Sequence, residues 1–93
     1  MTGQEPENER HPGMIKVRVM LPPGWGRMKK VLDERYWLEL PDEAILKDAL
    51  AAIRMPALVA KTMFVAVNGA LSKTNAPLKD GDSISFFPIV FGG

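Results

Sequence analysis

Hydrophobic and polar positions alternate in residues 14–21. One face of this stretch is apolar and consists of Ile15, Val17, Val19 and Leu21. The other face consists of Lys16, Arg18 and Met20. A period of two over this length indicates a half-buried β-strand. The following residues, Pro22–Gly26, break the pattern and predict a turn.

A second alternating stretch, residues 35–40, comes after the basic residues 27–30. One of its faces consists of Tyr36, Leu38 and Leu40, and the other of Trp37 and Glu39. This pattern predicts a second strand that pairs antiparallel with the first. We expect Pro41 to end it.

The period changes to that of a helix in residues 42–53. Apolar side chains recur there at i, i+3, i+4 and i+7, namely at Leu46, Ala49, Leu50 and Ile53. Acidic residues favour the first turn of a helix because the helix dipole is positive there. Asp42 and Glu43 therefore predict its start, and Pro56 predicts that it ends before that residue.

The C-terminal half of the chain is predicted to be mainly strand and turn. Residues 63–69 form a third strand that closes on Asn68-Gly69, a strong signal for a hairpin turn. Residues 70–78 are predicted to form a short edge strand and a loop. Asp80-Gly81 predicts a second turn, and a last strand starts at Ser83.

This order of elements predicts the α+β class and a β-grasp, or ubiquitin-like, fold. A mixed sheet of four to five strands would pack on one helix, with the first and last strands central and parallel to each other. We expect the domain to span residues 14–93 and to carry an extended C-terminal Gly-Gly tail. Residues 1–13 are polar and without periodicity, which predicts a disordered leader.

Composition excludes several classes of function. The 93 residues make one domain, and a net charge of +1 gives no reason to expect a nucleic-acid or membrane partner. No apolar run is long enough for a membrane span, and the N-terminus lacks the apolar region of a secretory signal, so a cytoplasmic location is expected. Without cysteine there is no thiol catalysis and no cysteine-ligated metal. The one histidine, His11, has no second metal ligand nearby.

Catalysis within the chain is not expected. The sequence has no phosphate-binding loop and no set of serine, histidine and aspartate that could form a triad. Asp80 and Asp82 flank a glycine, which turn chemistry explains better than a catalytic carboxylate pair. We therefore predict a protein that is not an enzyme by itself and that binds no cofactor.

The last strand changes character toward its end. Ile84 and Phe86 alternate with Ser83 and Ser85, which mark the solvent side. The same alternation places Phe87, Ile89 and Phe91 on that solvent side. Exposed apolar clusters usually mark a partner surface. The predicted partner-binding residues are Phe87, Pro88, Ile89, Val90 and Phe91.

Two alternatives concern the apolar residues of this region. The strand could instead twist or bulge at Pro88 and bury the apolar side chains around it. Trp25 and Trp37 either extend the apolar surface or cover their own loop and strand.

Gly92 and Gly93 come after this apolar segment. Extended residues 88–93 would reach roughly 17 Å from the fold. Lacking side chains, the two glycines could pass through a narrow channel and bring a terminal carboxylate to the active site of another protein. An ionised carboxylate is a poor electrophile and must first be activated, most simply as a mixed anhydride with AMP. The alternative is an ordinary frayed terminus.

Three segments resemble the sulfur-carrier branch of the ubiquitin-like proteins. They are LPDEAILKDALAAI (40–53), VAVNG (65–69) and LKDGDSISFFPIVFGG (78–93). That branch contains the molybdopterin synthase small subunit and the thiamine-biosynthesis sulfur carrier. The Phe-Phe-Pro step before the glycines is closer to the molybdopterin branch.

The resemblance implies a cycle of activation and transfer. An ATP-dependent adenylyltransferase, similar to ubiquitin-activating enzymes, would use ATP and Mg²⁺ to adenylate Gly93, which then becomes a thiocarboxylate. The sulfur would pass to the pterin precursor of the molybdenum or tungsten cofactor, with the tail held in the molybdopterin synthase large subunit or in another acceptor enzyme. The segment LPPGWGRMKK, Ile89 and Phe91 depart from the family pattern and leave the partner open.

Other functions fit the same residues. The chain could carry sulfur for the thiamine thiazole or for another metabolite. It could be a ubiquitin-like modifier that is joined to lysines of target proteins through Gly93. It could also be a β-grasp interaction module without chemistry of its own.

Overall fold

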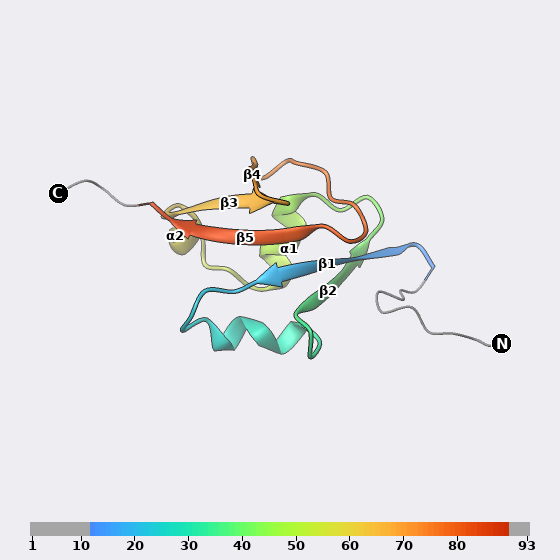
Figure 1. Cartoon of the computed structure of the whole chain (residues 1–93), viewed down its shortest axis with the longest axis horizontal. Coiled ribbons are helices and arrows are strands. Elements are labelled where there is room, and N and C mark those ends of the chain that lie inside the picture. The colour runs from blue at the N-terminus through green and yellow to red at the C-terminus, as the bar shows by residue number, and fades with distance from the viewer. Residues whose placement is uncertain (1–11, 90–93) are drawn as a thin grey trace.

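The computed structural model describes residues 12–89, and residues 1–11 and 90–93 lie outside the described part of the chain. Figure 1 shows the elements. The strands are β1 (Met14–Met20), β2 (Trp37–Pro41), β3 (Met63–Val67), β4 (Ala70–Leu71) and β5 (Ser83–Pro88). The helices are the 3-10 helix η1 (Gly26–Val31), α1 (Leu46–Ala52) and α2 (Ala57–Ala60). None of these helices is long and apolar enough to cross a membrane.

The five strands form one mixed sheet in the order β2-β1-β5-β3-β4. β1 and β5 are parallel neighbours, and the register places Val19 beside Ile84. The other three pairings are antiparallel. This arrangement confirms the predicted β-grasp fold, including the parallel pairing of the first and last strands.

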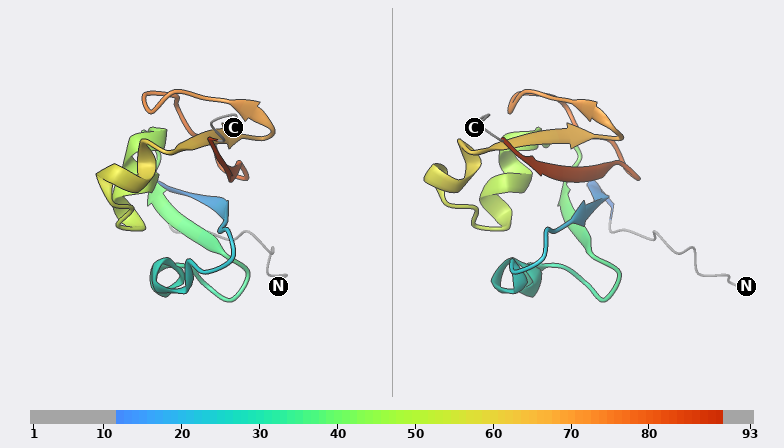
Figure 2. Two further views of the ribbon diagram at one scale, coloured as in Figure 1. Left: turned by 90° about the vertical axis from the view of Figure 1, so that its left-hand side faces the viewer. Right: turned by 60° about the vertical axis from the view of Figure 1, so that its left-hand side comes forward.

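The core lies between the sheet and α1. Figure 2 shows α1 and α2 on one side of the sheet. The predicted apolar faces of β1 and of α1 are buried there, and Val17 and Leu46 are completely shielded from solvent. Among the described residues, no polar or charged side chain is buried. The hydrophobic effect therefore supplies most of the stabilisation of this core.

The start of α1 differs from the prediction. The helix begins at Leu46 rather than at Asp42, because Ile45 is extended and forms a bridge to Pro77. The carboxylate that caps this helix is that of Asp48, which accepts a hydrogen bond of 2.8 Å from the Ile45 backbone N–H. The backbone N–H of Asp42 instead donates to the Gly13 carbonyl. Local hydrogen bonding thus delays the helix by one turn.

The end of α1 is a Schellman motif without glycine. The Arg54 N–H donates to the Ala51 carbonyl and the Met55 N–H to the Leu50 carbonyl, both at 3.0 Å. Such a motif needs a left-handed residue after the helix, usually glycine. Arg54 occupies that position with φ of 59°. Pro56 follows and prevents the helix from continuing, as predicted.

Two short helices were not predicted. η1 occupies the basic segment after Pro22–Gly26, and Met28 packs against the core from it. α2 is a single turn between α1 and β3. Neither has enough residues to show a period in the sequence, so both depend on packing for their stability. The sheet therefore packs on α1, as predicted, with two small helices beside it.

Tyr36 is not on the core face, and this prediction was wrong. Leu38 and Leu40 are buried as expected, but Tyr36 precedes β2 with φ of 68° and is 37% exposed. A left-handed residue interrupts the alternation of side chains, so the period of two starts only at Trp37.

The turn between β3 and β4 is tied to the start of β5. Asn68 and Gly69 both have positive φ, as the predicted hairpin turn requires. The Asn68 side-chain oxygen accepts from the Ser83 N–H at 2.9 Å, and its amide donates to Asp82 at 2.8 Å. Asp82 also accepts from the Lys79 N–H. These contacts position the residue from which β5 starts.

Replacing Asn68 with alanine removes both side-chain hydrogen bonds and leaves a less suited residue in the left-handed region. We expect the free energy of unfolding to fall by about 1–3 kcal/mol, measured by urea denaturation. Asn68→Gly keeps the backbone conformation accessible and should lie between wild type and Asn68→Ala. As a control, Ser72→Ala removes an exposed contact to the Ala70 carbonyl and should change stability by less than about 0.5 kcal/mol. An Asn68→Ala variant as stable as the control would show that the hydrogen bonds of Asn68 to Ser83 and Asp82 do not stabilise the fold.

Candidate functional site

β5 carries the chain toward its C-terminal end and holds it there. Pairing with β1 ends at Ser85, whereas pairing with β3 continues to Pro88. One residue further, the Ile89 N–H donates to the Thr62 carbonyl at 2.8 Å. The chain is therefore anchored through Ile89.

The two faces of β5 differ as predicted. Phe86 is 7% exposed and packs in the core, whereas Phe87 is 50% exposed on the opposite face. The register with β3 runs regularly through Pro88, so there is no bulge that would bury Phe87. Ile89 is only half-buried, which makes it a smaller part of the exposed surface than expected.

The other predicted site residues are Val90, Phe91, Gly92 and Gly93, and they lie outside the described residues. The roles of Phe87, Pro88 and Ile89 in binding a partner stay predictions.

Neighbouring strands extend the apolar surface around Phe87. Phe64 on β3 lies directly opposite Phe87 and is 48% exposed. The register places further exposed apolar side chains on this face, which is the side of the sheet that faces away from α1. We call this set the outer-face patch; its members are Met20, Phe64, Leu71 and Phe87.

The sequence did not identify three members of the outer-face patch. Alternation in residues 14–21 places Met20 on the same face as Lys16 and Arg18, and the sequence pattern assigns no face to Phe64 or Leu71. The alternation of residues 63–67 could have placed Phe64 opposite Val65. Its position beside Phe87 depends on the register between two strands, which a single-strand pattern does not contain.

The two tryptophans cover their own segments. The Trp25 ring lies 5.3 Å from the Phe86 ring, between centroids, and thus packs against the core side of the sheet. Trp37 is on the outer face, but the Arg18 guanidinium lies over its ring at 5.5 Å from the centroid. Neither ring joins the outer-face patch.

The turn before β2 is stabilised by Asp33. Its carboxylate accepts hydrogen bonds from the N–H groups of Arg35 at 2.8 Å and Trp37 at 3.0 Å. Its slight burial acts to raise the pKa of Asp33, but these two hydrogen bonds and the charges of Lys16 and Arg35 outweigh it and hold that pKa below its usual value. The turn fixes Tyr36 in its left-handed conformation, with the Tyr36 N–H donating to the Asp33 carbonyl.

Within residues 12–89, no three acidic or histidine side chains gather closely enough to hold a metal ion. Asp80 belongs to the turn that contacts β1, where it accepts a hydrogen bond from the Lys16 N–H. What this end of the molecule can do is present a rigid strand with an apolar surface beside it.

A family model matches residues 28–93 and is that of the ThiS family. This span covers more than half of the chain. The chain belongs to the ThiS family. The proteins of this family are small ubiquitin-fold sulfur carriers and modifiers, which agrees with the resemblance in the sequence. No curated protein matches the chain by sequence.

Solved structures of similar proteins share the fold of this ThiS-family chain. SAMP1 from Haloferax volcanii is 22% identical with a TM-score of 0.53, and the alignment covers 87% of this chain and 100% of SAMP1. The thiamine biosynthesis protein ThiS from Geobacter metallireducens is 17% identical with a TM-score of 0.52, over 85% of this chain and 100% of that protein. The HVO 2177 protein from Haloferax volcanii is 20% identical with a TM-score of 0.55, over 98% and 100% of the two chains.

Substitutions at the adjacent phenylalanines of β5 should have very different effects on stability. Phe86→Ala leaves a cavity in the core and should lower the free energy of unfolding by about 3–5 kcal/mol. Phe87→Ala is the matched control, because it removes a half-exposed ring and should cost less than about 1.5 kcal/mol. Urea denaturation measures both. Equal losses for the two variants would contradict the assignment of the faces.

The lowered pKa of Asp33 makes the stability of its turn depend on pH. The carboxylate stabilises the fold above its unfolded pKa of about 4, and this contribution is lost as the pH falls through the lower folded pKa. Asp33→Asn keeps an oxygen acceptor but cannot titrate. We therefore expect the variant to be less stable than wild type at pH 7 and the difference to shrink below about pH 4 in urea denaturation at a series of pH values. A difference that is constant with pH would exclude this contribution.

Proposed function

We propose that the chain is a sulfur carrier whose C-terminal Gly93 is adenylated and converted to a thiocarboxylate. The observation that carries this proposal is the match to the ThiS family, which extends over both Gly92 and Gly93. The structure supports it in one further respect. The pairing of β5 and the hydrogen bond of Ile89 hold the chain in place up to residue 89, next to the exposed Phe87. A partner could therefore bind this ordered surface while it binds the residues that follow.

Activation makes the terminal carboxylate reactive. A carboxylate oxygen of Gly93 attacks the α-phosphorus of ATP, and pyrophosphate leaves with the electron pair of the broken P–O bond. A sulfide-level sulfur donor then attacks the acyl carbon and expels AMP. The net change replaces one carboxylate oxygen by sulfur without oxidation or reduction of the glycine. ATP and Mg²⁺ belong to the activating enzyme in this scheme, and the chain itself binds no cofactor.

The pathway that we propose for the sulfur is molybdopterin synthesis. Its support is the sequence Phe86-Phe87-Pro88 before the tail, in which Phe86 is a core residue and Phe87 belongs to the exposed surface. The chain would act as the small subunit, with its tail held by the large subunit of the synthase. Delivery to the thiamine thiazole is the alternative within the same family.

A second candidate function is protein modification. One solved structure with this fold is described as small archaeal modifier protein 1 from Haloferax volcanii, at 20% identity. Both functions start with the same adenylate of Gly93. They differ in the nucleophile, because a modifier is transferred to a lysine amine of another protein instead of to sulfur.

Intact mass spectrometry tests the proposal. The chain is incubated with ATP, Mg²⁺, sulfide and the adenylyltransferase of its own organism. We expect a mass increase equal to the difference between a sulfur and an oxygen atom, and the increase should be absent for a chain that lacks Gly93. Deletion of Gly92 and Gly93 should abolish the reaction while leaving the stability unchanged, because the deleted residues lie beyond the anchored Ile89.

The other outcomes distinguish the alternatives. An unchanged mass, with the enzyme active on its established carrier, would rule out the carrier function and favour a plain interaction module. Lysine-linked adducts in a cell extract, lost on deletion of Gly93, would indicate a modifier. If the thiocarboxylate forms, its sulfur transfer is measured in two assays, one with the molybdopterin synthase large subunit and one with the enzymes of thiazole synthesis. The assay in which sulfur is transferred identifies the pathway.

A further inference from the structure

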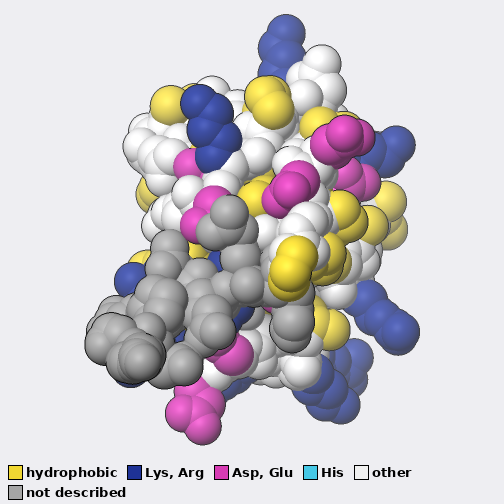
Figure 3. All heavy atoms as spheres, turned by 90° about the vertical axis from the view of Figure 1, so that its right-hand side faces the viewer, with side chains coloured by type: hydrophobic (Ala, Val, Ile, Leu, Met, Phe, Trp, Pro, Cys, Tyr) yellow, Lys and Arg dark blue, Asp and Glu magenta, His cyan; other side chains and the backbone are white. Residues whose placement is uncertain are grey.

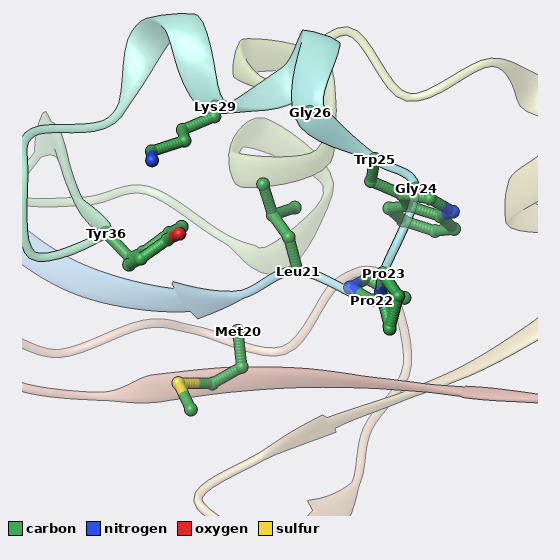
Figure 4. A pocket seen from close by; sticks show the side chains of 9 residues that line it. All are labelled: Met20, Leu21, Pro22, Pro23, Gly24, Trp25, Gly26, Lys29 and Tyr36. Carbon is green, nitrogen blue, oxygen red and sulfur yellow. The ribbon is translucent and has the colours of Figure 1, made fainter.

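A pocket of about 470 Å³ lies between the end of β1, the start of η1 and the turn before β2. Figure 4 shows its side chains. Met20 lies at one side, Trp25 with the two preceding prolines at another, and Lys29 with Tyr36 at a third. We call it the η1 pocket. Its volume is within the range of sites that accept a small group.

One wall of the η1 pocket is held in place by contacts within the chain. The ring of Pro22 restricts the backbone, and the Trp25 N–H donates to the Pro22 carbonyl at 3.3 Å. Trp25 is held against Phe86 of the core, and Met28 anchors η1 to the same core. A preformed site loses little conformational entropy on binding, which favours recognition.

Tyr36 forms the opposite wall and is held in an unfavourable backbone conformation. A bulky residue with a φ of 68° is a genuine outlier. The Val19 N–H donates to the Tyr36 carbonyl at 2.8 Å, and the Asp33 turn holds the preceding residues. Strained residues cluster at functional sites when the surrounding structure holds them in place. Here the strain places the Tyr36 ring beside Lys29.

Lys29 is the single charged residue that lines the η1 pocket. Its ammonium lies 5.0 Å from the centroid of the Tyr36 ring, which orients it by a cation–π contact. Among the described residues no carboxylate forms an ion pair with it, and η1 itself contains three cations and no acid. The nearest carboxylate in the sequence, that of Asp33, accepts hydrogen bonds from the N–H groups of Arg35 and Trp37 and does not line the pocket. Figure 3 shows further acidic side chains on the face of the molecule that is on the right in Figure 1. The η1 pocket is thus apolar with one positive charge.

The η1 pocket is continuous with the surface around the C-terminal end of β5. Met20 lines the pocket and also belongs to the outer-face patch, and its partner in the register is Ser85. The anchored Ile89 follows Ser85 by four residues, a distance of roughly 13 Å along the strand. This spacing is shorter than the width of a protein–protein interface of standard size, so a partner that holds the residues after Ile89 through such an interface has the η1 pocket within reach.

We propose that the η1 pocket receives an apolar side chain next to a carboxylate on the enzyme that activates the C-terminal tail. This inference rests on the proposed function. The apolar walls favour an apolar group, and the ammonium of Lys29, which is exposed and oriented over the Tyr36 ring, attracts an anionic neighbour. A nucleic acid would need several cations along a groove, whereas this pocket has one. The activating enzyme is the occupant because both sulfur transfer and protein modification begin with the activation of Gly93.

Adenylation kinetics test the assignment. The rate of pyrophosphate release by the adenylyltransferase is measured against the concentration of the full chain. Lys29→Glu should raise the KM for the chain about tenfold and leave kcat unchanged, because the charge acts in docking and not in the reaction. Lys29→Arg should stay within about twofold of wild type, because a guanidinium keeps the positive charge and also makes a cation–π contact with the Tyr36 ring. The matched control is Lys30→Glu, because this exposed neighbour on η1 lines a different hollow of the surface.

A second variant tests the wall of the pocket without relying on charge. Tyr36→Gly removes the ring and also relieves the left-handed strain, so the thermal midpoint should not fall substantially. Its KM should rise about fivefold, since a pocket wall and the orientation of Lys29 are lost together.

Each outcome decides between the alternatives. A rise in KM for Lys29→Glu and Tyr36→Gly, but not for Lys30→Glu, supports the η1 pocket. Equal rises for the two glutamate variants would indicate general electrostatic attraction and overturn it, as would unchanged KM values for all variants. If wild type is not activated by an enzyme that is active on its established carrier, the proposed function fails first, and the inference fails with it.

Discussion

The parallel pairing of β1 with β5 is the contact on which the rest of the structure depends. It aligns Val19 with Ile84, both almost completely buried below α1. β5 also pairs with β3, so it joins two separate hairpins into one sheet. A pairing between such distant segments costs loop-closure entropy before it gains contacts, and the shared apolar core provides the compensation. The outer-face patch is one consequence, because it combines side chains from both halves of the chain. The η1 pocket is lined by residues of the segment 20–36, but one of its walls, Trp25, packs against Phe86 of β5.

Most of the fold could be predicted from the sequence, because its strands and its main helix have clear periods. The buried faces of β1 and α1 follow directly from the spacing of their apolar residues. The differences occur where single hydrogen bonds override the pattern. The Asp48 carboxylate caps α1 one turn later than the acidic residues suggested, and the Asp33 turn removes Tyr36 from the strand. η1 and α2 are too short for any period and depend on tertiary packing.

Less of the candidate site could be predicted. The exposure of Phe87 follows from alternation within one strand, and it needs no knowledge of the neighbours. The position of Phe64 beside it requires the register between β3 and β5, which periodicity does not determine. The η1 pocket requires still more, since it depends on the left-handed backbone of Tyr36 and on the packing of Trp25 against the core. Gly92 and Gly93 stand out in the sequence for their chemistry, independently of the fold.

The position of β5 between two strands has a mechanical consequence. A force on the end of β5 that is directed along the strand acts parallel to the strand axis. The ladder hydrogen bonds to β1 and β3 run across that direction, so the pull loads them together and does not open them one after another. Among the described residues, the hydrogen bond between Ile89 and Thr62 is the one closest to the C-terminus and bears this force first. The pairings of β5 with β1 and β3 then transmit the force to both neighbouring strands. The domain can therefore be held under tension by its last residues while its core stays closed.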